Sequence, residues 1–231
     1  MTAPRVLVLA CGALAREILF LLPPERFPTI DLHCLPASLH NHPQRIGPAL
    51  RAALAERAGK YDRILIGYGD CGSGGAVDAV AAEFGATRLP GPHCYAFFHG
   101  IAAFDRLGDA DMRSFYLTDF LARQFRTLIW EGLGLDRHPE LRDAYFAHYE
   151  KVVFLAQTED AALTAAAQAA AAQLRLGFER RFVGYGDLAT ALLLATAESG
   201  GATSSSDRRS LATPSNACIT PAPTISAPPR M

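Results

Sequence analysis

Cysteine and histidine side chains recur directly after apolar runs that are typical of buried strands. Because the carboxyl ends of parallel strands meet at one edge of a sheet, we expect these side chains to lie close together. Thiolates and imidazoles are the ligands that zinc prefers, and a zinc site takes four of them or three plus water. The sequence therefore predicts a site for zinc or another soft metal. Its candidate ligands are Cys11, Cys71 and Cys94, with His40 or His93 as the fourth.

The same thiols allow two other interpretations. Free cysteine is among the most buried residue types, so these side chains could simply pack in a core. Alternatively, a thiolate at the start of a helix is stabilised by the helix dipole, as Cys11 and Cys71 would be. Cys71 would then act as a nucleophile without metal, and Asp70 or a histidine would accept the proton. The chain thus fits a metal protein, a thiol enzyme or a module that only binds a ligand.

The loop at residues 67–72 carries both Asp70 and Cys71. It reads Gly-Tyr-Gly-Asp-Cys-Gly between a strand and a helical pattern, which satisfies the G-x-G-x-x-G dinucleotide pattern. That pattern normally belongs to the first strand-to-helix turn, whereas this loop follows the third strand. We expect the loop to hold a small anionic group on its amides, beside the thiols. The candidate ligand-binding glycines are Gly67, Gly69 and Gly72.

Strand and helix patterns alternate along most of the chain. Strands are expected at 5–10, 30–35, 63–66, 86–90, 151–156 and 178–183, and a helical pattern follows each of them. From about 114 to 149 two helical patterns interrupt the alternation, one capped by Thr118 and Asp119 and one begun by Pro139. The pattern predicts an α/β fold with a doubly wound, mainly parallel sheet, helices on both faces and a helical insertion.

Length and composition favour one main domain. The 231 residues are half hydrophobic, enough for one sizeable core and short for two full domains. We expect a single α/β domain over residues 1–198, with the helical insertion at about 105–149. From residue 199 the chain is rich in serine, threonine, proline and alanine, which predicts a disordered tail at 199–231.

Charge and hydropathy restrict the partners. Lysine plus arginine (22) nearly balance aspartate plus glutamate (23), and no basic block is present, which argues against nucleic acid. No apolar run reaches the roughly 20 residues that span a bilayer, and the first apolar run is too short for a signal peptide. We therefore expect a cytoplasmic protein with free thiols and a small molecule as its ligand.

Three short motifs resemble those of a known family. They read Leu-Ala-Cys-Gly-Ala-Leu at 9–14, Leu-His-Asn-His-Pro at 39–43 and Gly-Tyr-Gly-Asp-Cys-Gly at 67–72. Over about residues 4 to 195 the chain resembles the uncharacterised domain of unknown function 1638 family. The resemblance implies a cytoplasmic α/β domain, often encoded near corrinoid-dependent methyl-transfer systems, and it implies no catalytic residues. A small-molecule or one-carbon transfer protein that binds a soft metal is the resulting hypothesis.

Overall fold

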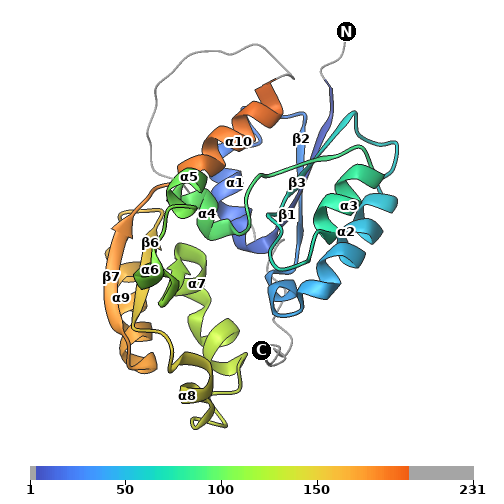
Figure 1. Ribbon diagram of the computed structural model, residues 1–231. Coiled ribbons are helices and arrows are strands. Elements are labelled where there is room, and N and C mark those ends of the chain that lie inside the picture. The colour runs from blue at the N-terminus through green and yellow to red at the C-terminus, as the bar shows by residue number, and fades with distance from the viewer. Residues whose placement is uncertain (1–3, 198–231) are drawn as a thin grey trace.

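Parallel strands form two sheets in the computed structural model, which describes residues 4–197 (Figure 1). The first sheet has the order β2-β1-β3-β4, and the second has the order β5-β6-β7. Every strand pairing in both sheets is parallel. The strands are β1 (Val6–Cys11), β2 (Ile30–Leu35), β3 (Arg63–Gly67), β4 (Thr87–Arg88), β5 (Ser114–Thr118), β6 (Lys151–Ala156) and β7 (Gly177–Phe182).

Helices cover both faces of the first sheet. Side chains alternate along β1, so Leu7 and Leu9 point to one face while Val8 and Ala10 point to the other. The first face packs against α2 (Ile46–Ala55) and α3 (Ala76–Glu83). The second packs against α1 (Ala15–Leu21) and α10 (Gly186–Ala197), on the opposite side in Figure 1. Both faces of β1 are consequently buried, which explains its unbroken apolar sequence.

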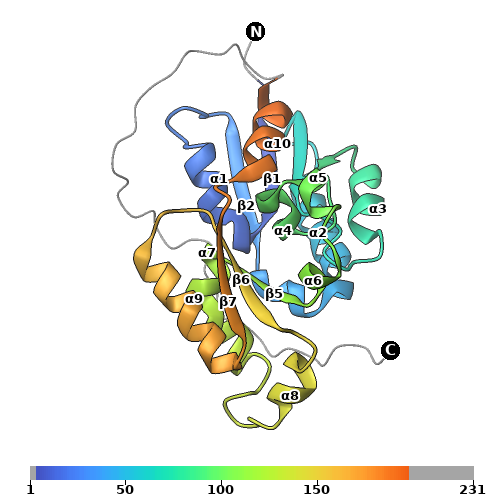
Figure 2. The same cartoon turned by 60° about the vertical axis from the view of Figure 1, so that its left-hand side comes forward.

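The second sheet packs one face against α7 (Asp119–Gln124), α8 (Leu141–Phe146) and α9 (Ala161–Leu174). The alanine-rich α9 begins at Asp160, whose side chain accepts hydrogen bonds from the amides of Ala162 and Leu163. The other face of the sheet contacts α4 (Cys94–His99) through β6. Figure 2 shows α9 on one side of β6 and β7, and α4, α5 and α6 on the other.

Short helices connect these elements. They are η1 (Gly12–Leu14), η2 (Ala37–Asn41), η3 (Pro43–Arg45), α5 (Ile101–Phe104), α6 (Asp109–Met112) and the π-helix η4 (Phe125–Glu131). Gly100 has a φ of 89°, and it separates α4 from α5 within the stretch where one helix was expected. No helix of the described part of the chain is long and apolar enough to cross a membrane.

The predicted α/β fold with parallel strands and helices around them is confirmed. The strands are divided between two sheets, however, because the chain leaves the two-residue strand β4 through α4 to α6 and starts a new sheet at β5. β5 lies inside the stretch where only helical patterns were expected, immediately before the Thr118 cap of α7. The domain boundaries stay a prediction, and the expected tail at 199–231 lies outside the described residues.

Candidate functional site

A cavity of about 300 Å³, here called the seam cavity, lies between the two sheets. Segments that follow all four strands of the first sheet line one side of it, and residues from β5, α7 and η4 line the other. The first side presents polar and sulfur-bearing side chains, namely His40, Asn41, Cys71, His93 and Cys94. The opposite side is apolar and includes Phe115, Phe120, Leu121, Leu128 and Ile129. The cavity therefore joins a thiol and imidazole surface to an apolar wall.

Four of the five predicted metal ligands line this cavity: His40, Cys71, His93 and Cys94. The fifth, Cys11, lies beside it at the end of β1 and is 2% exposed. Its Sγ atom is 3.5 Å from Nδ1 of His40 and accepts a hydrogen bond from the amide of Ala13 at 3.3 Å. The expected gathering of thiols and imidazoles at the carboxyl edge of the first sheet is therefore present.

These residues do not form a preassembled metal site. Among the described residues, no group of three or more histidine, cysteine, aspartate or glutamate side chains is arranged to hold an ion. Burial raises the pKa of Cys11 to about 12. Burial also raises the pKa of Cys94, and the nearby thiols of Cys71 and Cys11 add to this effect. A metal ion would have to displace the protons of both buried thiols, so the metal site stays a prediction.

The imidazole of His93 is electrically neutral at neutral pH. Its pKa is lowered chiefly by burial and further by the neighbouring His40, while Asp70 opposes the shift. A neutral imidazole has one nitrogen that donates and one that accepts a hydrogen bond. The raised pKa values of Cys11 and Cys94 likewise keep these two thiols protonated at neutral pH. The raised pKa values of Cys11 and Cys94 oppose a nucleophilic role for these two thiols. The nucleophilic role of Cys71, which is itself only 8% exposed, stays a prediction.

Cys71 has an unusual backbone conformation. Its φ of 51° lies in the left-handed region, which costs a residue with a Cβ atom about 1–2 kcal/mol. The loop is fixed there because the Cys71 amide donates to the Pro92 carbonyl at 2.8 Å and the Asp70 amide donates to Gly91 at 3.3 Å. Glycine would adopt this conformation freely, so a cysteine here indicates that its side chain is needed in the cavity.

The carboxylate of Asp70 is held by its own loop. Oδ1 accepts hydrogen bonds from the amide of Gly75 at 2.8 Å and from the hydroxyl of Ser73 at 3.0 Å. The Gly75 bond is the main reason why the pKa of Asp70 is lowered. This carboxylate occupies the place on the loop amides where an external anion was expected to bind. The structure thus gives Asp70 a part in shaping the loop, and its catalytic role stays a prediction.

Local packing or backbone conformation explains why glycine occupies the three positions that were predicted to contact a ligand. A Cβ atom on Gly67 would lie 2.6 Å from that of Ala10 on the neighbouring strand. One on Gly69 would lie 2.8 Å from the Gly91 carbonyl oxygen, and Gly72 has a φ of 77°. The close approach of β1 and β3 and the tight loop explain the glycine pattern without a dinucleotide. A ligand contact by these glycines stays a prediction.

Comparison with known families supports the resemblance to the domain of unknown function 1638 family. A family model described as "Protein of unknown function (DUF1638)" matches residues 34–192, which are 159 of the 231 residues. The chain belongs to this family. The matched stretch includes the motifs at 39–43 and 67–72 and begins after the motif at 9–14. No curated protein and no solved structure matches the chain.

Part of the seam cavity of this DUF1638 protein was not expected from the sequence. No sequence motif singled out Phe115 and Phe120, which line the cavity, whereas the nearby Phe125 is buried in the core. Leu128 and Ile129 come from η4, a π-helix of seven residues. π-helical turns are rare and occur frequently at functional sites, so this second irregular backbone also points to the seam cavity.

Glu17 of α1 is a buried carboxyl group whose pKa is influenced by the charge of Arg123 on α7. Glu17 is 5% exposed, and its Oε2 atom has no hydrogen-bond partner among the described residues. Nη1 of Arg123 is likewise buried without a partner, while Nη2 lies 3.8 Å from Asp119. Burial raises the pKa of Glu17 to about 7, opposed in part by Arg123. The helix α1 thus carries a buried ionisable group that interacts with charged side chains of α7.

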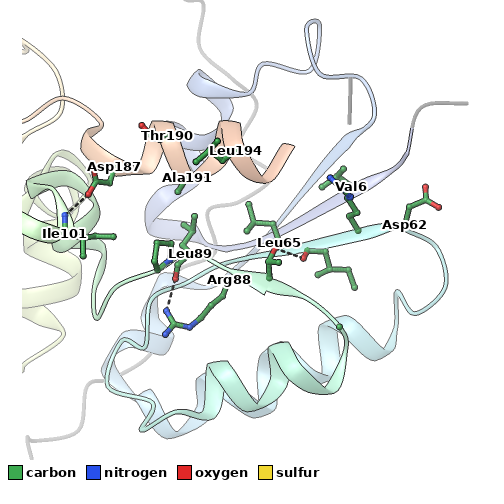
Figure 3. Close-up of a pocket in the computed structure, with 15 residues that line it drawn as sticks. Val6, Asp62, Leu65, Arg88, Leu89, Ile101, Asp187, Thr190, Ala191 and Leu194 are labelled. Atoms are coloured by element: carbon green, nitrogen blue, oxygen red, sulfur yellow. Dashed lines mark hydrogen bonds between the residues drawn. The ribbon is translucent and has the colours of Figure 1, made fainter. Parts of the chain in front are cut away.

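A larger hollow, of about 700 Å³, lies elsewhere, between β3, β4 and α10 (Figure 3). None of the predicted site residues lines it. Its charged side chains already serve the fold: Arg88 donates to the Leu89 carbonyl at 2.7 Å, and Asp187 accepts from the Ile101 amide at 2.6 Å. Volume therefore favours this hollow, but the chemistry of the lining side chains favours the seam cavity as the functional site.

Proposed function

We propose that this DUF1638 protein binds a small molecule in the seam cavity. One observation carries the proposal: segments after the four strands of the first sheet and an apolar wall from the second half of the chain enclose a single space of about 300 Å³. Ligands of α/β proteins collect at the carboxyl ends of the strands, and small-molecule sites combine apolar walls with a few polar groups. The volume is at the lower end of the usual range, which favours a small metabolite.

The irregular backbone around the cavity supports the same proposal. Cys71 occupies a left-handed position at a cost in stability, and η4 departs from the α-helix where it supplies Leu128 and Ile129. Strained and irregular backbone concentrates at binding sites, since selection for stability alone would remove it. The two irregular segments come from different halves of the chain and line the same space.

A variant in which a larger side chain fills the cavity tests the proposal. Acetophenone is a small neutral probe whose saturable binding can be followed by saturation-transfer NMR. We expect it to bind the native protein and to lose saturable binding in the Ala13→Phe variant, because Ala13 lines the cavity and a benzyl group would occupy it. Ala82→Phe, on the exposed side of α3, is the matched control and should bind as the native protein does. Absence of saturable binding, or equal binding by Ala13→Phe, contradicts the proposal.

A soft-metal site is the second candidate, because the thiols and imidazoles are close enough to influence one another. The thiols of Cys71 and Cys11 contribute to the raised pKa of Cys94, and His40 contributes to the lowered pKa of His93. Zinc bound there would require deprotonation of the thiols and movement of the side chains into a tetrahedral set. One-carbon chemistry and a corrinoid methyl-transfer partner stay predictions from the family resemblance.

Elemental analysis of protein purified without oxygen tests the metal candidate. We expect near-stoichiometric metal in the native protein and its loss in the Cys71→Ser variant. Addition of Cd²⁺ should also produce the ultraviolet absorption of cadmium thiolates, which Cys71→Ser should weaken. Metal-free native protein that gives no such absorption contradicts the candidate and leaves the small-molecule proposal unaffected.

A further inference from the structure

In the part of the chain that the structure describes, the lining of the seam cavity contains no carboxylate, ammonium or guanidinium group. Among the described residues that line it, none is aspartate, glutamate, lysine or arginine. A charged ligand would enter without a counter-charge in contact, and burial of an unpaired charge is costly. The lining therefore favours a neutral ligand.

One polar group of the lining lacks a partner. The Nδ2 atom of Asn41 is buried and makes no hydrogen bond to any described residue. Two other polar side chains of the cavity are engaged: Thr118 accepts from the Leu121 amide at 3.3 Å, and His40 lies 3.5 Å from Cys11. Buried polar groups are nearly always hydrogen-bonded, so an unsatisfied donor on a residue that lines a ligand cavity favours a hydrogen-bond acceptor on the ligand.

The apolar wall of the cavity favours a ligand with an apolar body. Phe115, Phe120 and Leu128 lie on the side contributed by the second half of the chain, whereas Asn41 comes from η2 after β2. A molecule that spans the cavity would place its apolar body against the wall and its acceptor at Asn41. This arrangement rests on the proposed small-molecule function and adds the chemical class of the ligand.

We propose that the seam cavity takes a neutral molecule with an apolar body and a carbonyl-type oxygen, and that Asn41 donates a hydrogen bond to this oxygen. Asn41 is then the residue that distinguishes an oxygen-bearing ligand from a hydrocarbon of the same shape. An unpaired polar group in a site that was built for a hydrogen bond discriminates against ligands that lack the partner.

Four probes of similar size test this class at pH 7.5: acetophenone, ethylbenzene, benzoate and benzylammonium. We expect the native protein to bind acetophenone about three- to tenfold more tightly than ethylbenzene, the range of one net neutral hydrogen bond. Both charged probes should bind at least about tenfold more weakly than acetophenone, because no lining side chain pairs with their charge. Dissociation constants come from saturation-transfer titrations.

The Asn41→Leu variant, nearly isosteric with the native residue, should bind acetophenone and ethylbenzene equally. Equal binding of these two probes by the native protein overturns the proposal, as does tightest binding of benzoate or benzylammonium. An unchanged preference in a folded Asn41→Leu variant overturns the role of Asn41. If none of the four probes binds saturably, the proposed function itself fails, which is a different outcome from binding without discrimination. The native comparison holds even if the variant does not fold.

Discussion

Replacement of Glu17 by glutamine should stabilise the protein in a pH-dependent manner. Burial raises the pKa of this carboxyl from 4.5 to about 7. Between these two values the native protein keeps the proton and the unfolded chain has lost it, so native stability falls as the pH rises through this range. Above both values the loss is complete and amounts to about 3 kcal/mol. Glutamine does not titrate and removes this loss.

Urea unfolding at pH 4 and pH 8 measures this effect, with the fluorescence of Trp130, the only tryptophan of the chain, as the signal. We expect the free energy of unfolding of Glu17→Gln, relative to the native protein, to rise by about 3 kcal/mol between pH 4 and pH 8. The control is Glu25→Gln, at an exposed position, which should show no such change. A difference between Glu17→Gln and the native protein that is equal at both pH values would refute the reasoning.

Three further variants test the glycine loop by urea unfolding. Gly67→Ala should lose about 2 kcal/mol, because its methyl group would lie 2.6 Å from the Cβ atom of Ala10; native stability would show that β1 and β3 can separate at little cost. Asp70→Asn should lose about 1–2 kcal/mol at neutral pH. Because the pKa of Asp70 is lowered from 3.8, this difference should disappear only below that pH, and its absence at neutral pH argues against the loop role. Cys71→Gly should keep or gain about 1 kcal/mol, since glycine relieves the left-handed backbone, and a clear loss of stability would show that the thiol serves packing.

The sequence predicted the arrangement of the polar side of the site because strand direction determines it. Apolar runs followed by helical patterns implied parallel strands, and parallel strands bring the residues after them to one edge. His40, Cys71, His93 and Cys94 accordingly line one cavity. β5 was missed because its five residues run directly into the strong cap at Thr118, and the helical signal that follows dominates the pattern.

Other features depend on contacts that no local pattern specifies. The direction of the Asp70 carboxylate follows from the loop amides that enclose it, although an aspartate before Ser73 and several glycines is typical of such a turn. The π-helix η4 differs too little from an α-helix in its periodicity to be recognised. The burial of Glu17 could have been predicted from its spacing. It lies three residues after Leu14 and four before Leu21, on the apolar side of its helix.

A crystal structure of the protein grown with saturating acetophenone tests the seam cavity most directly. We expect electron density for the ring against Phe120 and Leu128, with the carbonyl oxygen within hydrogen-bond distance of Nδ2 of Asn41. Acetophenone bound in the larger hollow between β3, β4 and α10, with an empty seam cavity, would contradict the assignment of the site.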